Sequence, residues 1–112
     1  MPEDDKQYDK QMRALSHPLR RQLLRLMLGR PEALSPREAS RILDVHLHNV
    51  SYHLRVLANC AAVTLVATQP VRGSVQHFYR PAPAMKSSWA RAVLRRQEPT
   101  DTATNRDDET AQ

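Results

Sequence analysis

The first half of the chain has the apolar spacing of short amphipathic helices. Over residues 5–15 apolar side chains recur every three or four positions, Tyr8 and Met12 among them, which predicts a helix with one narrow apolar stripe. A second helix is predicted to begin at Pro18 and to be capped by Gly29, because proline favours the first helical position and glycine the C-terminal cap.

Two further helices follow, joined by a very short link. Residues 35–38 read Ser-Pro-Arg-Glu, which combines a capping box with proline at the first helical position and marks a helix that runs to about Leu43. Residues 44–46 lead into another helical pattern, from about Leu47 to Ala58. Two short helices joined by three residues predict a helix-turn-helix.

The apolar pattern changes after residue 62. β-Branched and aromatic residues over 63–68 and 75–79 predict two strands, and residues 69–74 have the proline and glycine of a hairpin loop, with Arg72 near its tip. A last helix is predicted over residues 84–96. The element order is α-α-α-α-β-β-α, a mainly α winged helix-turn-helix with a β-hairpin wing.

The predicted helix from residue 47 to 58 has two chemically different faces. At about 100° per residue, four apolar residues gather on one face, which we assign to the core: Leu47, Val50, Leu54 and Leu57. The opposite face is polar and aromatic, with one cation and no acid, which suits base edges and phosphates. The expected DNA-binding residues are His48, Asn49, Ser51 and Tyr52 for bases, with Arg55 and Arg72 for the backbone.

Charge divides the chain into a basic middle and acidic ends. Residues 13–96 hold fourteen Lys and Arg against three acidic residues, a net charge of +11. Residues 1–12 hold two cations against four acids, a net charge of −2, and residues 97–112 hold one against five, a net charge of −4. An arginine-rich body attracts polyanions, so double-stranded DNA is the expected partner. We predict a winged-helix domain over residues 1–96, which includes dimerisation helices at its two ends, and a disordered acidic tail over 97–112.

Other sequence features bear on the cellular compartment. No apolar run approaches the roughly twenty residues of a membrane span, and the first residues are acidic where a signal peptide is basic. The single cysteine rules out an intramolecular disulfide. These features predict a soluble cytoplasmic protein without membrane association.

The sequence offers little for metal or catalytic chemistry. His48 and His53 are five apart, about 140° from each other on a helix, and His46 and His77 do not complete a ligand spacing, so no metal site is predicted. Cys60 could be a redox switch, but its place at a helix end amid alanines favours a buried, inert thiol. With no phosphate loop, paired carboxylates or nucleophile elbow, neither an enzyme nor a cofactor is expected.

Three segments carry distinctive sequences in a fixed order. They are Ala14–Arg21, which reads Ala-Leu-Ser-His-Pro-Leu-Arg-Arg, then Val50–Leu57, which reads Val-Ser-Tyr-His-Leu-Arg-Val-Leu, and a Gly-tipped hairpin that ends at Tyr79. In their order and spacing they resemble the ArsR family of winged-helix regulators. The resemblance covers about residues 12–81. It implies a homodimer that sits on operator DNA and usually represses.

The chain departs from that family at two places. Many members sense metals or arsenicals through paired thiolates near the third helix, but residues 36–42 contain no cysteine, so a thiolate metal sensor is not expected. Relatives commonly have glycine after the recognition helix, where this chain reads Asn-Cys-Ala-Ala from residue 59. Either Asn59 adopts the left-handed conformation that ends the helix, or the helix runs further.

Apolar side chains on the terminal helices exceed what a winged helix needs for its own core: Tyr8, Met12, Met85, Trp89 and Val93. We favour a homodimer interface over a core role for them. The same stripe can frame a pocket for a small-molecule effector whose identity is open. Two alternatives to a sequence-specific regulator also stay open, a winged-helix module that docks an acidic protein and a protein that coats DNA without sequence preference.

Overall fold

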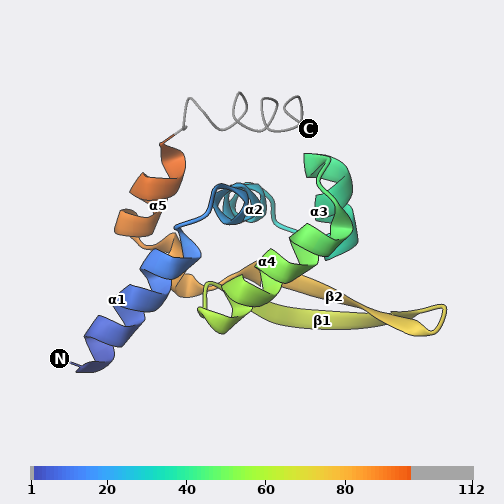
Figure 1. Cartoon of the computed structure of the whole chain (residues 1–112), viewed down its shortest axis with the longest axis horizontal. Coiled ribbons are helices and arrows are strands. Elements are labelled where there is room, and N and C mark those ends of the chain that lie inside the picture. Colours follow the sequence, from blue (N-terminus) through green and yellow to red (C-terminus); the bar gives the residue numbers. More distant parts are fainter. Residues whose placement is uncertain (1, 97–112) are drawn as a thin grey trace.

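The computed structural model describes residues 2–96 of the chain, with side chains described from residue 8 onward. Its helices are α1 (Pro2–Ala14), α2 (Pro18–Leu28), α3 (Pro36–Leu43), α4 (Leu47–Asn59) and α5 (Ser88–Arg95), with a short 3₁₀ helix, η1 (Pro83–Lys86). Strands β1 (Val63–Val71) and β2 (Ser74–Pro81) form an antiparallel hairpin. This is the predicted winged helix-turn-helix architecture (Figure 1). The predicted tail, 97–112, lies outside the described residues.

The helix ends follow the local chemistry of the sequence. Ser35 caps α3, where its hydroxyl accepts from the Glu38 N–H at 3.2 Å. The reciprocal half of a capping box is replaced by an ion pair, in which the Glu38 carboxylate lies 3.0 Å from the Arg30 guanidinium. Gly29 caps α2 as predicted, with an ordinary negative φ of −89°. These ends fix the lengths of the two helices that flank the link before α3.

The core forms where α2 and the inner face of α4 meet. Val50, Leu54 and Leu57 of α4 are fully buried, and Leu23 and Leu24 of α2 are buried with them. Burial of such side chains stabilises the fold by about 1.5–3 kcal/mol each. The core therefore fixes one face of α4 and leaves the other outside.

Leu47 does not belong to this core. It is 36% exposed because it lies in the first turn of α4, at the edge of the helix that faces the hairpin. The core assignment of Leu47 is therefore wrong, while Val50, Leu54 and Leu57 confirm the rest of the predicted apolar face.

The hairpin is longer and its turn tighter than predicted. Pairing runs from Val63 opposite Pro81 to Val71 opposite Ser74, with a bulge between Leu65 and Ala67. Only Arg72 and Gly73 form the turn, and both have positive φ, 45° and 81°, the geometry of a two-residue type I′ connection. The predicted loop over 69–74 is thus mostly strand. Figure 1 shows the hairpin projecting from the helical body, with its turn far from α1 and α5.

The base of the hairpin is tied to the segment before α3. Leu34 and Tyr79 exchange two backbone hydrogen bonds, each 2.9 Å long. Both side chains are buried. This bridge connects the wing to the helix-turn-helix at its root.

The C-terminal region differs from the single helix predicted over residues 84–96. Met85 lies in η1 and is fully buried, whereas Ser87 is extended and caps α5 by accepting from the Ala90 N–H at 3.2 Å. The four-residue spacing of Met85, Trp89 and Val93 thus spans two separate helices, η1 and α5.

Earlier in the chain, α4 continues to Asn59, and Ala61 adopts the left-handed conformation with a φ of 58°. The second of the two expectations for Asn59 is therefore confirmed.

Candidate nucleic-acid interface

The outer face of α4 carries the predicted polar set. His48, Asn49, Tyr52 and Arg55 are all exposed, Tyr52 by 51%. No acidic residue occurs in α4. The helix therefore presents hydrogen-bonding groups and one cation on a surface that would not repel phosphate.

The link between α3 and α4 holds this face in a defined orientation. Asp44 adopts the left-handed conformation, with φ 55° and ψ 49°, which turns the chain sharply after α3. The Ser40 hydroxyl donates to the Val45 carbonyl at 2.6 Å, and His46 Nδ1 accepts from the His48 N–H at 3.1 Å. Side chains thus satisfy backbone groups on both sides of the turn, as a rigid helix-turn-helix requires.

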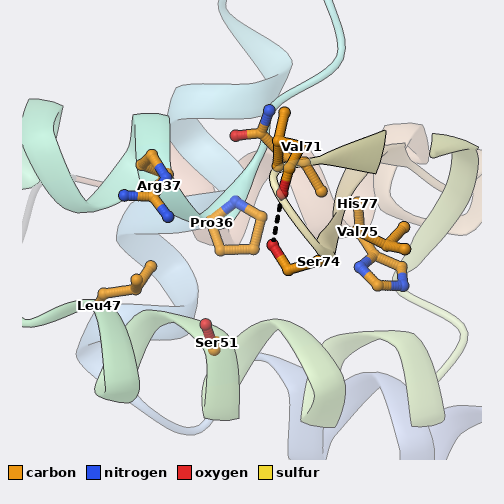
Figure 2. Close-up of a pocket in the computed structure, with 9 residues that line it drawn as sticks. Pro36, Arg37, Leu47, Ser51, Val71, Ser74, Val75 and His77 are labelled. Carbon is orange, nitrogen blue, oxygen red and sulfur yellow. Dashed lines mark hydrogen bonds between the residues drawn. The ribbon is translucent and has the colours of Figure 1, made fainter. Parts of the chain in front are cut away.

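Ser51 faces a cleft beside the hairpin, unlike the exposed polar residues of α4. It is half-buried and lines a cleft of about 170 Å³ between α4, the start of α3 and the hairpin. Figure 2 shows its hydroxyl directed from α4 toward Pro36 and Ser74. Ser51 is thus separated from the exposed set, and it faces the wing.

Arg37 is a cation at this cleft that the sequence reasoning did not select. It is exposed in the first turn of α3 and lies across the cleft from Val75 and His77 of the hairpin (Figure 2). The available signal was a basic residue in the first turn of the predicted helix, two positions after the N-cap Ser35. The cleft therefore has a guanidinium at its edge.

The hairpin turn carries Arg72 at its tip, where the side chain is exposed. Nothing lies within 4 Å of the position that a Cβ on Gly73 would take, so the turn projects into solvent. The hairpin and the cleft therefore lie between Arg72 and the outer face of α4.

Behind α4 lies a buried cation, Arg20, that supports the helix. Its guanidinium donates to the Arg13 and Ala14 carbonyls at 2.9 and 3.3 Å and to the Ser16 hydroxyl at 3.0 Å. A further donor, Nη1, lies 3.1 Å from His53 Nδ1 on α4. Arg20 thus connects the end of α1 with α4. Helical spacing alone places Arg20 on an outer face of α2, so its burial was missed.

His53 is held in its neutral form by this environment. Burial, the largest cause, acts together with the nearby His17 and Arg20 to lower the pKa of His53 to about 4. Burial also lowers the pKa of His17, whose ring centroid lies 4.2 Å from that of His53. Because arginine only donates, His53 Nδ1 must accept, which leaves the ring proton on Nε2.

Tyr52 connects this buried cluster to the outer face of α4. Its ring packs edge-on against that of His53, with centroids 5.0 Å apart and an interplanar angle of 74°. Such a contact restrains an exposed aromatic side chain. The position of Tyr52 therefore depends on His53 and, through it, on Arg20.

The predicted interface residues fall into two groups. Tyr8, Met12 and Trp89 are exposed by 52%, 45% and 36%, and the Tyr8 and Trp89 rings lie 5.6 Å apart. Val93 is half-buried, and Met85 lies in the core of the chain itself. The exposed apolar patch of Tyr8, Met12 and Trp89 therefore joins α1 and α5 without Met85.

Two further properties concern the described residues as a whole. Among residues 8–96, no three His, Cys, Asp or Glu side chains come together in a way that could hold a metal ion. No helix in the described part of the chain is long and apolar enough to cross a membrane.

Comparison with known proteins agrees with this geometry. A family model described as a helix-turn-helix domain matches residues 15–63, from the residue after α1 to the first residue of β1. Among solved structures, HlyU from Vibrio cholerae N16961 superposes with a TM-score of 0.60 at 22% sequence identity, over 85% of this chain and 91% of that one. The chain has a winged helix-turn-helix fold. No curated protein sequence matches it significantly.

Proposed function

We propose that this winged helix is a DNA-binding transcriptional regulator of the ArsR type, a homodimeric repressor in the cytoplasm that recognises an inverted-repeat operator. The observation that carries the proposal is the exposed, acid-free face of α4, backed by a hydrogen-bonded cluster and flanked by an arginine-tipped wing. The same observation favours DNA over an acidic protein partner, because the hydrogen-bonding side chains of this face match the donors and acceptors of base edges. Neither catalysis nor thiolate metal sensing belongs to this function.

Recognition would proceed through α4 in the major groove. His48, Asn49 and Tyr52 are exposed and carry the donors and acceptors that read base edges. Arg55 lies on the same helix and would contact the phosphate backbone, while Arg72 would reach a phosphate or the minor groove from the wing tip. Ser51 would act from the cleft, which Arg37 also lines.

Dimerisation would place two such helices on one duplex. The patch of Tyr8, Met12 and Trp89 is apolar, exposed and formed by both terminal helices. It lies on α1 and α5, far from the wing tip (Figure 1). A two-fold axis through this patch would leave both copies of α4 outward, and half-sites one helical turn apart, about 34 Å, would receive them.

The salt dependence of binding tests this function. The protein is titrated onto a fluorescent duplex at several salt concentrations, and excess random duplex is then added as competitor. We expect a steep fall in affinity with salt, because each phosphate contact releases counterions, together with retained binding to a preferred duplex against the competitor. Equal affinity for all duplexes would indicate a DNA-coating protein, and absence of DNA binding would favour a protein-docking module.

A further inference from the structure

A second hollow lies away from the α4 face, between the C-terminal end of α2 and α5. Its volume is about 460 Å³, and it is lined by Arg25, Leu28, Gly29, Arg91, Leu94 and Arg95. This volume is within the range of about 300–1,000 Å³ that is usual for small-molecule sites. No acidic side chain is among the described residues that line it.

The groove combines cations with an apolar floor. Leu28 is half-buried and Leu94 is almost fully buried, and together they supply the apolar surface. Arg91 and Arg95 are exposed at one side. Arg25 closes the other side, where its Nη1 donates to the Leu94 carbonyl at 3.3 Å. Guanidinium groups bind a carboxylate with paired, charge-assisted hydrogen bonds.

The groove is compatible with the dimer proposed above. At about 100° per residue, Arg91 and Arg95 lie on average about 200° around α5 from Trp89 and Val93. A second copy that covers Trp89 would therefore leave the arginine side of α5 open. A ligand in the groove would contact α2, the helix whose first turns hold Arg20 against α4.

We propose that this groove binds a small aliphatic carboxylic acid, with the carboxylate on Arg91 and Arg95 and the aliphatic chain on Leu28 and Leu94. The acidic segment 97–112 matches the charge of the groove but is a poor match for its floor. Its apolar side chains are limited to one proline and two alanines, too small to cover the leucines. An effector role for this ligand rests on the proposed function, whereas its binding does not.

Octanoate is the probe for a direct test on the full chain without DNA. Calorimetry is expected to give a dissociation constant on the order of 0.1–1 mM, as suits a ligand of about ten heavy atoms. The methyl NMR signals of Leu28 and Leu94 should shift on the same titration. Octanol, with the same chain and no carboxylate, should bind at least tenfold more weakly.

Matched variants locate the site. The double variant Arg91→Gln/Arg95→Gln should weaken octanoate binding at least tenfold, while Lys10→Gln/Arg41→Gln, which removes two exposed cations elsewhere, should leave it within twofold. Circular dichroism checks that each variant is folded. Unchanged affinity in the first variant, or methyl shifts confined to other residues, would overturn the proposal.

A final variant separates the free acid from the acidic segment of the chain. The five carboxylates of residues 97–112 are changed to amides in the full chain. Octanoate affinity within threefold of the parent supports a site for a free acid. A rise of tenfold or more would assign the groove to residues 97–112 and overturn the proposal.

Discussion

The guanidinium of Arg20 on α2 lies 3.1 Å from Nδ1 of His53 on α4, so a buried cation with no described carboxylate beside it supports the helix proposed to read DNA. The remaining donors of Arg20 reach the Arg13 and Ala14 carbonyls at the end of α1 and the hydroxyl of Ser16. One side chain thus joins a helix of the proposed dimer interface to the proposed recognition helix. A displacement of α1 would therefore change the hydrogen bond between Arg20 and His53.

Replacing Arg20 should destabilise the fold. Arg20→Met removes the donors to four acceptors while keeping much of the side-chain volume, and buried groups left without a partner are costly. We expect the free energy of unfolding in urea to fall by about 2–3 kcal/mol. Arg41→Met, at an exposed position of α3, is the control and should change it by less than about 0.5 kcal/mol. Equal effects of the two changes would contradict the role given to Arg20.

The stability of the protein should fall in mild acid because of His53. Its pKa is about 4 in the folded chain and near the ordinary 6.5 when unfolded, so between these values the unfolded chain binds more protons. The free energy of unfolding should therefore fall as pH is lowered from 6.5 toward 4. Allowing for the partial exposure of the ring, we expect a contribution of about 1–2 kcal/mol.

His53→Gln isolates this contribution. Glutamine keeps a hydrogen-bond acceptor for Arg20 but does not titrate, so the variant should lose less stability than the parent between pH 6.5 and 4. His17→Gln should flatten the profile in the same direction, because burial and the arginines beside it lower the pKa of His17 too. Parallel pH profiles of the parent and His53→Gln in urea denaturation would show that His53 does not titrate as described.

Side chains of α4 and the wing should affect DNA binding differently. Asn49→Ala or Tyr52→Ala should reduce the preference for one duplex by about 1–3 kcal/mol, because each removes groups that contact bases. Arg72→Ala should weaken binding to all duplexes alike and make the salt dependence shallower, because it removes a backbone contact. Anisotropy titrations on preferred and random duplexes distinguish the two patterns. The assignment fails if all three variants behave alike.

Two methionines provide a paired test of the dimer surface. Met12 is 45% exposed, so Met12→Glu should leave the fold intact and shift the protein to monomer in sedimentation velocity. Met85 is fully buried in the same chain, so Met85→Ala should lower the free energy of unfolding by about 2–5 kcal/mol. A Met12→Glu protein with the sedimentation coefficient of the parent would rule out this patch as the interface.

Local signals in the sequence predicted most of the fold. Ser35 and Pro36 mark the start of α3 through backbone chemistry, and the β-branched segments around residues 63 and 75 mark the strands, because these signals act within a few residues. The position of the turn at Arg72 and Gly73 was also predicted, although the two strands are longer than predicted and continue to Val71 and Ser74.

Features that depend on contacts between distant segments were not predictable in this way. Met85 and Trp89 have helical spacing, yet the extended Ser87 separates η1 from α5. The apolar spacing alone does not reveal this break. The burial of Arg20 depends on carbonyls at the end of α1 and on a histidine thirty-three positions away. Leu47 is exposed because the hairpin lies beside its turn of α4 without covering it. In each case tertiary packing decides the outcome.

Selection of bound duplexes from a random DNA pool is the most direct test of the central claim. The full chain is incubated with the pool at about physiological salt, and the bound duplexes are sequenced through successive rounds. The account predicts an enriched inverted repeat with half-sites about one helical turn apart, read by two copies of α4. A pool that is retained on the protein without any enriched sequence would contradict it.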